Sequence, residues 1–234
     1  MTGLVRDGAE ALSRCHRVAR TEGLAHALSV LQSAVLPGML PCGPGGHAVV
    51  PVDVAASARQ VWRAGVVSDR SSADEAILLT AALPDGGVVA LRLRADPTGT
   101  FDGCAEDGMT WALGLLWLRL GSSEGLLDAC TAYLGERHTG ESSLLHQQMV
   151  QGAIAEVLID HLEIRAVLAD AHPGHLSPAT LADLHDRITW ADRALLRLLG
   201  ASGFVAGGPG QVAQISEILA EVHTGVPERK RVRQ

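Results

Sequence analysis

Apolar residues recur at helical spacing in the first part of the chain. Between residues 4 and 36 they return every three or four positions, which is typical of one face of an α-helix. Gly23 interrupts this pattern, and a glycine costs about 1 kcal/mol in a helix interior. The sequence therefore predicts two helices that are divided at Gly23. Prolines and glycines at 37–46 end the second helix and mark a first boundary.

Short apolar runs replace the helical pattern between residues 48 and 96. The β-branched positions at 49–54 predict a short strand, and the apolar run 76–81 has the length of another strand. A Pro-Asp-Gly-Gly turn at 84–87 separates that run from a third one at 88–93. Two runs joined by a short turn favour an antiparallel hairpin, predicted here over 76–93. The Gly- and Asp-rich stretch 97–109 is interpreted as a linker.

Helical periodicity returns at about residue 110 and continues toward the C-terminus. The pattern predicts helices over 111–137, 142–171, 177–199 and 211–223. Ser177 followed by Pro178 is a favoured start for the third of them. Four helices with short connections indicate an antiparallel up-and-down bundle. Six residues are expected in its core: Leu126, Leu127, Leu144, Ile154, Leu158 and Leu196.

The predicted fold class is mainly α, with a small antiparallel β segment and a C-terminal four-helix bundle. We divide the chain into an N-terminal helical segment (1–47), a reduced β domain with its linker (48–109), the bundle (110–225) and a basic tail (226–234). The tail is charged and is expected to be disordered.

Composition excludes several classes of protein. The 234 residues are 47% hydrophobic and 19% charged, which argues against a disordered chain. No stretch approaches the roughly 20 apolar residues of a membrane span, so no membrane contact is expected. The net charge of −7 argues against a nucleic-acid partner. The four cysteines are scattered and predict free thiols. Asp7 stands where a signal peptide has a basic and then an apolar region, so a cytoplasmic protein is expected.

Several stretches resemble the acyl-CoA dehydrogenase superfamily, which includes the related flavin-dependent hydroxylases. Residues 120–137 end in a Glu-Arg pair as one family helix does, and Leu144 and Gln148 then keep the family's register. Residues 198–210 are similar to the glycine-rich turn before the family's last helix. Residues 71–86 resemble the hairpin of the family's middle domain. Their order and spacing indicate a truncated, divergent member with the fold of that family.

The resemblance implies an FAD site that a neighbouring subunit helps to form. In the family, FAD lies between the β domain and the bundle. Arg137 would pair with its diphosphate, Gln148 would supply an amide, and Gly207 and Gly208 would let the backbone approach the cofactor. Plainer roles are also open, because the helix dipole favours an arginine at a helix C-terminus and glycines often serve turns.

Departures from the family's pattern gather where the chemistry would take place. Ala220 and Glu221 stand where the family's last helix carries an Arg-Asp pair, and the family's catalytic glutamate has no clean counterpart. Catalytic residues are therefore unassigned. Glu221 and His223 are expected on a solvated helix end. Gly140 and Glu141 replace the Phe-Gly that follows the family's arginine.

Two weaker patterns are interpreted as structural. His172 and His175, with Asp170 and His185 nearby, have the residue types of a metal site. The two histidines lie on a Pro-Gly loop and no cysteine is nearby, so no metal is predicted. Ser122 and Ser123 are interpreted as turn residues and not as nucleophiles.

Three functions stay open from the sequence. The first is an FAD-dependent oxidoreductase that acts on an acyl thioester or a small organic substrate, as a homo-oligomer. The second is a non-catalytic subunit or scaffold of the same fold, in a hetero-oligomer with a complete paralogue. The third is a module that binds a small ligand in the cleft between the β domain and the bundle. The residues implied to bind FAD favour the first function, and the missing catalytic base and the reduced N-terminal and β domains favour the second.

Overall fold

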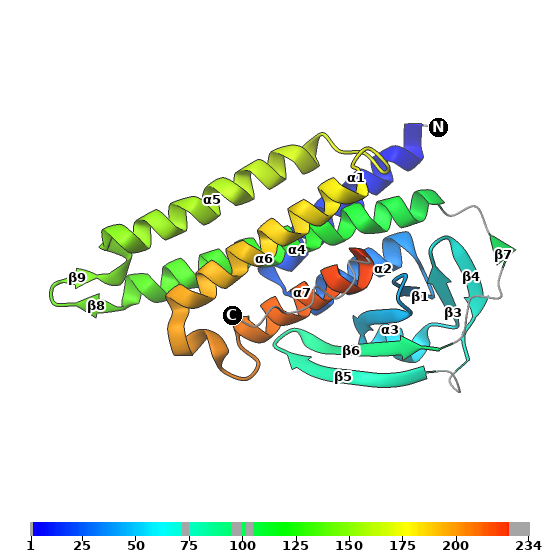
Figure 1. The fold of residues 1–234 in the computed structure, drawn as a ribbon, viewed down its shortest axis with the longest axis horizontal. Helices are drawn as coiled ribbons and strands as arrows, with labels where there is room; N and C mark the ends of the chain where they lie inside the picture. Colours follow the sequence, from blue (N-terminus) through cyan, green and yellow to red (C-terminus); the bar gives the residue numbers. More distant parts are fainter. Residues whose placement is uncertain (1, 72–74, 95–99, 102–104, 225–234) are drawn as a thin grey trace.

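Long helices form one side of the molecule and β strands the other (Figure 1). The computed structural model describes residues 2–71, 75–94, 100–101 and 105–224. The predicted tail at 226–234 lies outside these residues. Within the described ranges, no helix combines the length and hydropathy that crossing a bilayer would need.

The first two helices meet at Gly23, as predicted. They are α1 (Thr2–Thr21) and α2 (Leu24–Val35). Gly23 has a φ of 115°, which favours glycine, and a Cβ there would lie 2.3 Å from Asp85 Cγ. Asp85 Oδ2 accepts a hydrogen bond from the His26 backbone N–H at 3.0 Å, in the first turn of α2. The missing side chain at Gly23 therefore lets a β turn cap this helix.

The described β strands between residues 39 and 101 form two small sheets. One has the order β1 (Met39–Cys42), β3 (Gln60–Arg63), β4 (Val66–Asp69) and β7 (Thr100–Phe101). Its β1–β3 pair is parallel, so the β segment is not purely antiparallel as expected. The other sheet is antiparallel, in the order β2 (His47–Pro51), β6 (Gly86–Leu93) and β5 (Glu75–Leu83), with α3 (Val52–Ser57) after β2. The β5–β6 pair confirms the predicted hairpin.

Four long helices follow the strands. They are α4 (Ala105–Glu136), α5 (Gln148–Ala169), α6 (Pro178–Leu199) and α7 (Pro209–Thr224). Helix α4 begins inside the stretch 97–109 that was interpreted as a linker, and β7 lies there too. The Ser177 hydroxyl caps α6 as predicted by accepting the Thr180 backbone N–H at 3.1 Å. The short 3-10 helix η3 (Gly200–Phe204) joins α6 to the turn before α7.

The predicted start of the second long helix at residue 142 is wrong. A small hairpin, β8 (His138–Thr139) and β9 (Ser142–Ser143), and the 3-10 helix η2 (Leu144–His146) precede α5. Gly140 in the hairpin turn has a φ of 66°, a conformation that ends helical geometry and favours glycine. The hairpin extends beyond the long helices at one end of the molecule (Figure 1).

Helix α4 lies at the centre of the helical side, and its leucines are buried around its whole circumference. Helix α1 packs along α4, so the helical side is larger than the four helices predicted. A Cβ on Gly121 would lie 2.2 Å from the His16 carbonyl oxygen, and one on Gly125 2.8 Å from that of Arg20. These glycines let the backbones of α1 and α4 approach closely.

The six predicted core residues have three outcomes. Leu126, Leu127 and Leu196 are buried as predicted. Leu144 and Ile154 are half-buried. The prediction was wrong for Leu158, which is 45% exposed because it lies on the side of α5 that faces away from the other helices.

Candidate functional site

Arg137 directly follows α4 and is exposed. Its guanidinium carbon lies 4.7 Å from the centre of the Tyr133 ring, a cation–π contact that orients the side chain. Its backbone carbonyl accepts the Leu144 N–H at 2.7 Å, which ties it to the β8–β9 hairpin. Within the described residues, Arg137 forms no ion pair with a carboxylate. Its positive charge is therefore available to an external anion.

Gln148 begins α5 on the other side of the same hairpin and is exposed. The β8–β9 hairpin thus places Arg137 and Gln148 at one end of the long helices (Figure 1). The structure brings these two predicted residues to the same region of the surface.

Gly207 and Gly208 lie in the turn before α7. Gly207 has a φ of 71°, and its N–H donates to the Gln211 side-chain oxygen at 2.9 Å. The Gly208 N–H donates to the Val205 carbonyl at 2.8 Å, and a Cβ on Gly208 would lie 2.7 Å from that oxygen. The turn alone accounts for both glycines, and both N–H groups already have partners. Their cofactor role stays a prediction.

A cavity of about 660 Å³ lies beside this turn, between α6 and α7. Most of its polar lining comes from Thr189, Asp192, Arg193, Gln211 and Glu217, and Phe204 and Val205 add exposed apolar surface. None of the four residues predicted to bind the cofactor is in this lining, although Ala206, directly before Gly207, is. Arg137 and Gln148 flank the β8–β9 hairpin, whereas Gly207 and Gly208 lie in the turn before α7.

The sequence interpretation missed a buried guanidinium in α4. Arg119 is fully buried, and it donates to Ser216 Oγ at 2.9 Å, to Thr189 Oγ1 at 2.8 Å and to His185 Nδ1 at 2.9 Å. Burial lowers the pKa of Arg119 to about 10 and, with the nearby Arg119 charge, lowers the pKa of His185 well below its usual value. Arginine has no acceptor, so His185 Nδ1 must be the unprotonated nitrogen. The available signal was a single charge within the apolar run 111–120.

Ser122 and Ser123 are not turn residues, because both lie within α4, and Ser123 is 1% exposed. The Ser123 hydroxyl lies 2.8 Å from His161 Nε2 of α5. Asp192 of α6 is also buried, and burial raises its pKa to about 6, although the Ser123 hydroxyl and the Arg119 charge oppose the rise. Asp192 Oδ1 has no hydrogen-bond partner among the described residues. Asp192 thus adds a titratable carboxyl to the cavity lining.

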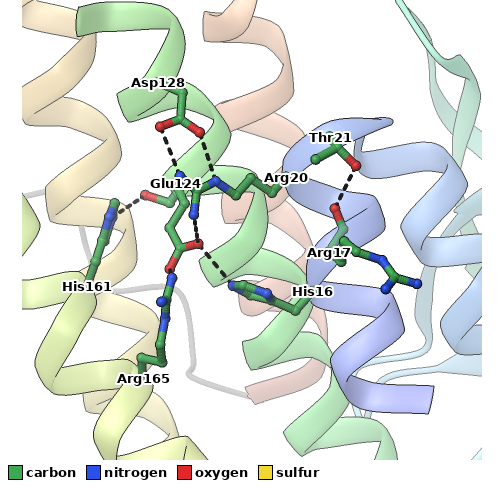
Figure 2. A network of polar contacts seen from close by, with 9 residues as sticks. His16, Arg17, Arg20, Thr21, Glu124, Asp128, His161 and Arg165 are labelled. Atoms are coloured by element: carbon green, nitrogen blue, oxygen red, sulfur yellow. Dashed lines mark hydrogen bonds and ion pairs between the residues drawn. The ribbon is translucent and has the colours of Figure 1, made fainter. Parts of the chain in front are cut away.

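Glu124 joins three helices in the interior (Figure 2). Its carboxylate is 4% exposed and lies 3.0 Å from His16 Nε2 and 3.2 Å from Arg20 Nη1 on α1. It also pairs with Arg165 on α5. Burial raises the pKa of Glu124, but hydrogen bonds and charges from His16 and Arg165 outweigh it and bring the pKa to about 2. Glu124 therefore stays ionised and links α1, α4 and α5.

The expectation of a solvated helix end is wrong for His223. Trp111 Nε1 donates to His223 Nδ1 at 3.4 Å, and burial lowers the pKa of His223 to about 4. Its ring packs against that indole because α7 crosses α4 there. Glu221 is exposed, as expected.

The weak metal pattern is divided between two environments. His172 and His175 are exposed in the loop after α5, whereas His185 is buried beside Arg119. In the described ranges, no three His, Cys, Asp or Glu residues are grouped as metal ligands. Cys15, Cys42 and Cys130 are buried free thiols, and Cys104 lies outside the described residues.

Comparison with known proteins identifies the fold. No family model matches the sequence. A solved structure from Mycobacterium smegmatis, assigned as an acyl-CoA dehydrogenase, aligns with 93% of this chain and 78% of its own at a TM-score of 0.62 and 14% identity. The ChsE4–ChsE5 complex from Mycobacterium tuberculosis aligns with 95% of this chain and 77% of the matched chain, at a TM-score of 0.52 and 15% identity.

A third solved structure has the same fold, and the alignment covers a smaller share of that protein. It is a glutaryl-CoA dehydrogenase from Mycobacterium smegmatis in complex with FADH2, with a TM-score of 0.53 and 10% identity. The alignment covers 80% of this chain and 56% of that enzyme. The chain has the acyl-CoA dehydrogenase fold, which confirms the fold class that the resemblance implied.

Proposed function

We propose that this chain is a subunit of an acyl-CoA dehydrogenase-type flavoprotein and that Arg137 binds the FAD diphosphate. The observation that carries the proposal is the exposed Arg137 guanidinium, which has no carboxylate partner in the described part of the chain. A planar guanidinium forms paired, charge-assisted hydrogen bonds with phosphate oxygens. The acyl-CoA dehydrogenase fold supports FAD as the anion.

The residues around Arg137 fit such a group. The Tyr133 ring limits the directions that the guanidinium can take, and Gln148 adds an amide donor and acceptor on the same part of the surface. When bound, FAD would supply the electron acceptor for oxidation of an acyl thioester or a small organic substrate. The turn at Gly207 and Gly208 would border the flavin from the side of the cavity.

A complete site of this kind needs two chains. Arg137 and Gln148 flank the hairpin, whereas Gly207 and Gly208 lie beside the cavity between α6 and α7. A neighbouring subunit can bring the first pair to the second, as the resemblance implies. We therefore place the proposed flavin at a contact between subunits.

Arg137→Ala is expected to weaken FAD binding by about tenfold to a hundredfold, because a charge-assisted hydrogen bond is lost. The measurements are the flavin absorbance per purified chain and a fluorescence titration with FAD. Arg14→Ala is the matched control, since Arg14 is another exposed arginine without an ion pair among the described residues. Its binding should equal that of the wild type. A wild-type protein that is colourless and takes up no added FAD would contradict the proposal.

A second candidate function is a non-catalytic subunit that partners a complete paralogue. It is favoured by the internal partners of the buried titratable groups, because Glu124, Arg119 and His161 all contact side chains of their own chain. The solved ChsE4–ChsE5 complex also joins two differently named chains. Light scattering of this chain mixed with a full-length relative tests the candidate. A stable mixed oligomer supports it, and two separate species contradict it.

A further inference from the structure

A second cavity lies where the two N-terminal helices meet the β strands. It has a volume of about 470 Å³, and its walls come from the α1–α2 junction, the β5–β6 turn, the second half of α4 and the start of α7. Figure 1 shows the β5–β6 turn beside the start of α7. We call it the junction cavity and define it by Gly23, Asp85, Ser122, Asp192 and Val212. Segments that are distant in the sequence thus form one pocket.

Asp192 gives the junction cavity a buried carboxylate that its own chain satisfies only in part. The residue is 4% exposed, and it lines this cavity as well as the one between α6 and α7. A hydrogen bond from the Ser123 hydroxyl lowers the pKa of this carboxyl, but its Oδ1 has no partner among the described residues. Arg119 acts on it by charge and donates its hydrogen bonds to other side chains. A buried oxygen without a donor is costly, so a ligand that brings a donor gains affinity here.

Two more carboxylates line the junction cavity. Glu22 is exposed directly after α1, and Asp85 is half-buried in the β5–β6 turn. Neither forms an ion pair with a described residue. Arg20 also lines the cavity, but its guanidinium is paired with Asp128 and Glu124. The side chains around the junction cavity therefore carry a net negative charge.

The two cavities that share Asp192 differ in charge. Arg193 and Arg197 both line the cavity between α6 and α7. Arg193 is paired with Glu217, whereas Arg197 is exposed and forms no ion pair within the described ranges. A cation would therefore meet a like charge there, and carboxylates in the junction cavity. Of the two, the junction cavity is the one that suits a positively charged ligand.

Apolar side chains complete the junction cavity. Leu24 and Leu126 are buried in its walls, and Val212 adds further carbon surface. Ligand pockets of this kind hold an apolar body and orient it with a few polar groups. We propose that the junction cavity binds a small organic amine, whose ammonium group donates to Asp192 and whose apolar body lies between α4 and α7. An ammonium group has donors and no acceptor, so it matches a lining of carboxylates.

This site is separate from the proposed flavin and goes beyond it. Arg137, Gln148, Gly207 and Gly208 are not among the residues described in the lining of the junction cavity. Amine binding and flavin binding are therefore separate outcomes. A wild-type chain that binds the amine and takes up no FAD would support the junction cavity and contradict the flavin proposal, and a flavoprotein that binds no amine would do the reverse.

Benzylamine is the probe, because its amine is protonated at pH 7. Calorimetric titration of the full chain should show binding, and benzyl alcohol, which has a similar shape without the charge, should bind about tenfold more weakly. Asp192→Asn should also weaken benzylamine binding about tenfold, because it removes the charge and keeps the shape. Asp183→Asn is the matched control, since Asp183 is exposed on the same helix and outside both cavity linings. Equal affinity for the two probes, or unchanged benzylamine binding by Asp192→Asn, overturns the proposal.

Glu22→Gln gives an independent test at an exposed position, where folding is not at risk. It removes one of the cavity's negative charges, so benzylamine should bind more weakly than to the wild type, while binding of benzyl alcohol should not change. An equal change for both probes would contradict an electrostatic role for this lining.

The location has its own test. Ala129 is exposed on α4 and lines the junction cavity, so the ring of Ala129→Phe should abolish benzylamine binding by filling the pocket. Gln214→Phe is the matched control, because Gln214 is exposed on α7 and lines the other cavity. Circular dichroism checks that both variants are folded. The reverse result, or a wild type that binds no benzylamine at millimolar concentration, overturns the proposal.

Discussion

Glu124→Gln is expected to lower the free energy of unfolding by about 3 kcal/mol at pH 7, because a neutral amide replaces a buried carboxylate whose hydrogen bonds to charged side chains contribute about 1.5–3 kcal/mol each. Glu124 is 4% exposed in its side chain and lies within ion-pair distance of His16, Arg20 and Arg165. Urea unfolding of both proteins measures the difference. Glu10→Gln is the control, because Glu10 is exposed and has no ion pair among the described residues, and its unfolding midpoint should not change.

The effect of Glu124→Gln should also depend on pH. The folded-state pKa of Glu124 is about 2, against 4.5 for an ordinary glutamate. A lowered acid pKa gives stability that is fully present above about pH 4.5 and is lost as the pH falls toward 2. The difference between wild type and variant should therefore shrink over that interval. An equal difference at pH 7 and at pH 2.5 would contradict the role given to this carboxylate.

Gly121→Ala is expected to lower the free energy of unfolding by about 2 kcal/mol, an overpacking cost. The new Cβ would lie 2.2 Å from the His16 carbonyl oxygen, so the backbone of α1 would have to move away from α4. That movement would also draw His16 and Arg20 away from Glu124 (Figure 2). Thermal unfolding measures the loss.

Gly135→Ala provides the matched control on the same helix. The nearest atom to a Cβ at Gly135 is Leu145 Cδ2 at 4.0 Å, which is an ordinary contact. Alanine is the better helix former by about 1 kcal/mol, so this variant should be as stable as the wild type or more stable. Equal losses in the two variants would show that close packing against α1 is not the cause.

Local signals predicted the elements that local chemistry determines. Gly23 ends α1 because its backbone has a positive φ, and the Pro-Asp-Gly-Gly turn joins β5 to β6. The β8–β9 hairpin was missed because its strands are two residues each and polar, too short to show an alternating pattern. The packing of α1 along α4 depends on residues about a hundred positions apart, which no local periodicity reveals.

The site was predictable to a smaller extent. The fold that the resemblance implied is confirmed, and Arg137 is exposed at the end of a helix as an anion-binding role would need. The polar contacts of Arg119 and Glu124 could not be derived from spacing, because their partners lie on other helices. Leu158 was placed in the core because α5 is apolar on both sides, so its periodicity does not indicate which side faces inward.

The contact between the β5–β6 turn and the start of α2 has a consequence for cooperativity. Asp85 fills the space that Gly23 leaves open and accepts a hydrogen bond from the His26 N–H. The β5–β6 hairpin therefore packs against the junction of the two N-terminal helices. Opening the hairpin would expose that junction, and fraying of the junction would release the hairpin. Amides of the hairpin and of the first turn of α2 should therefore exchange with solvent deuterium together, as one local unfolding unit that spans the β strands and the helices.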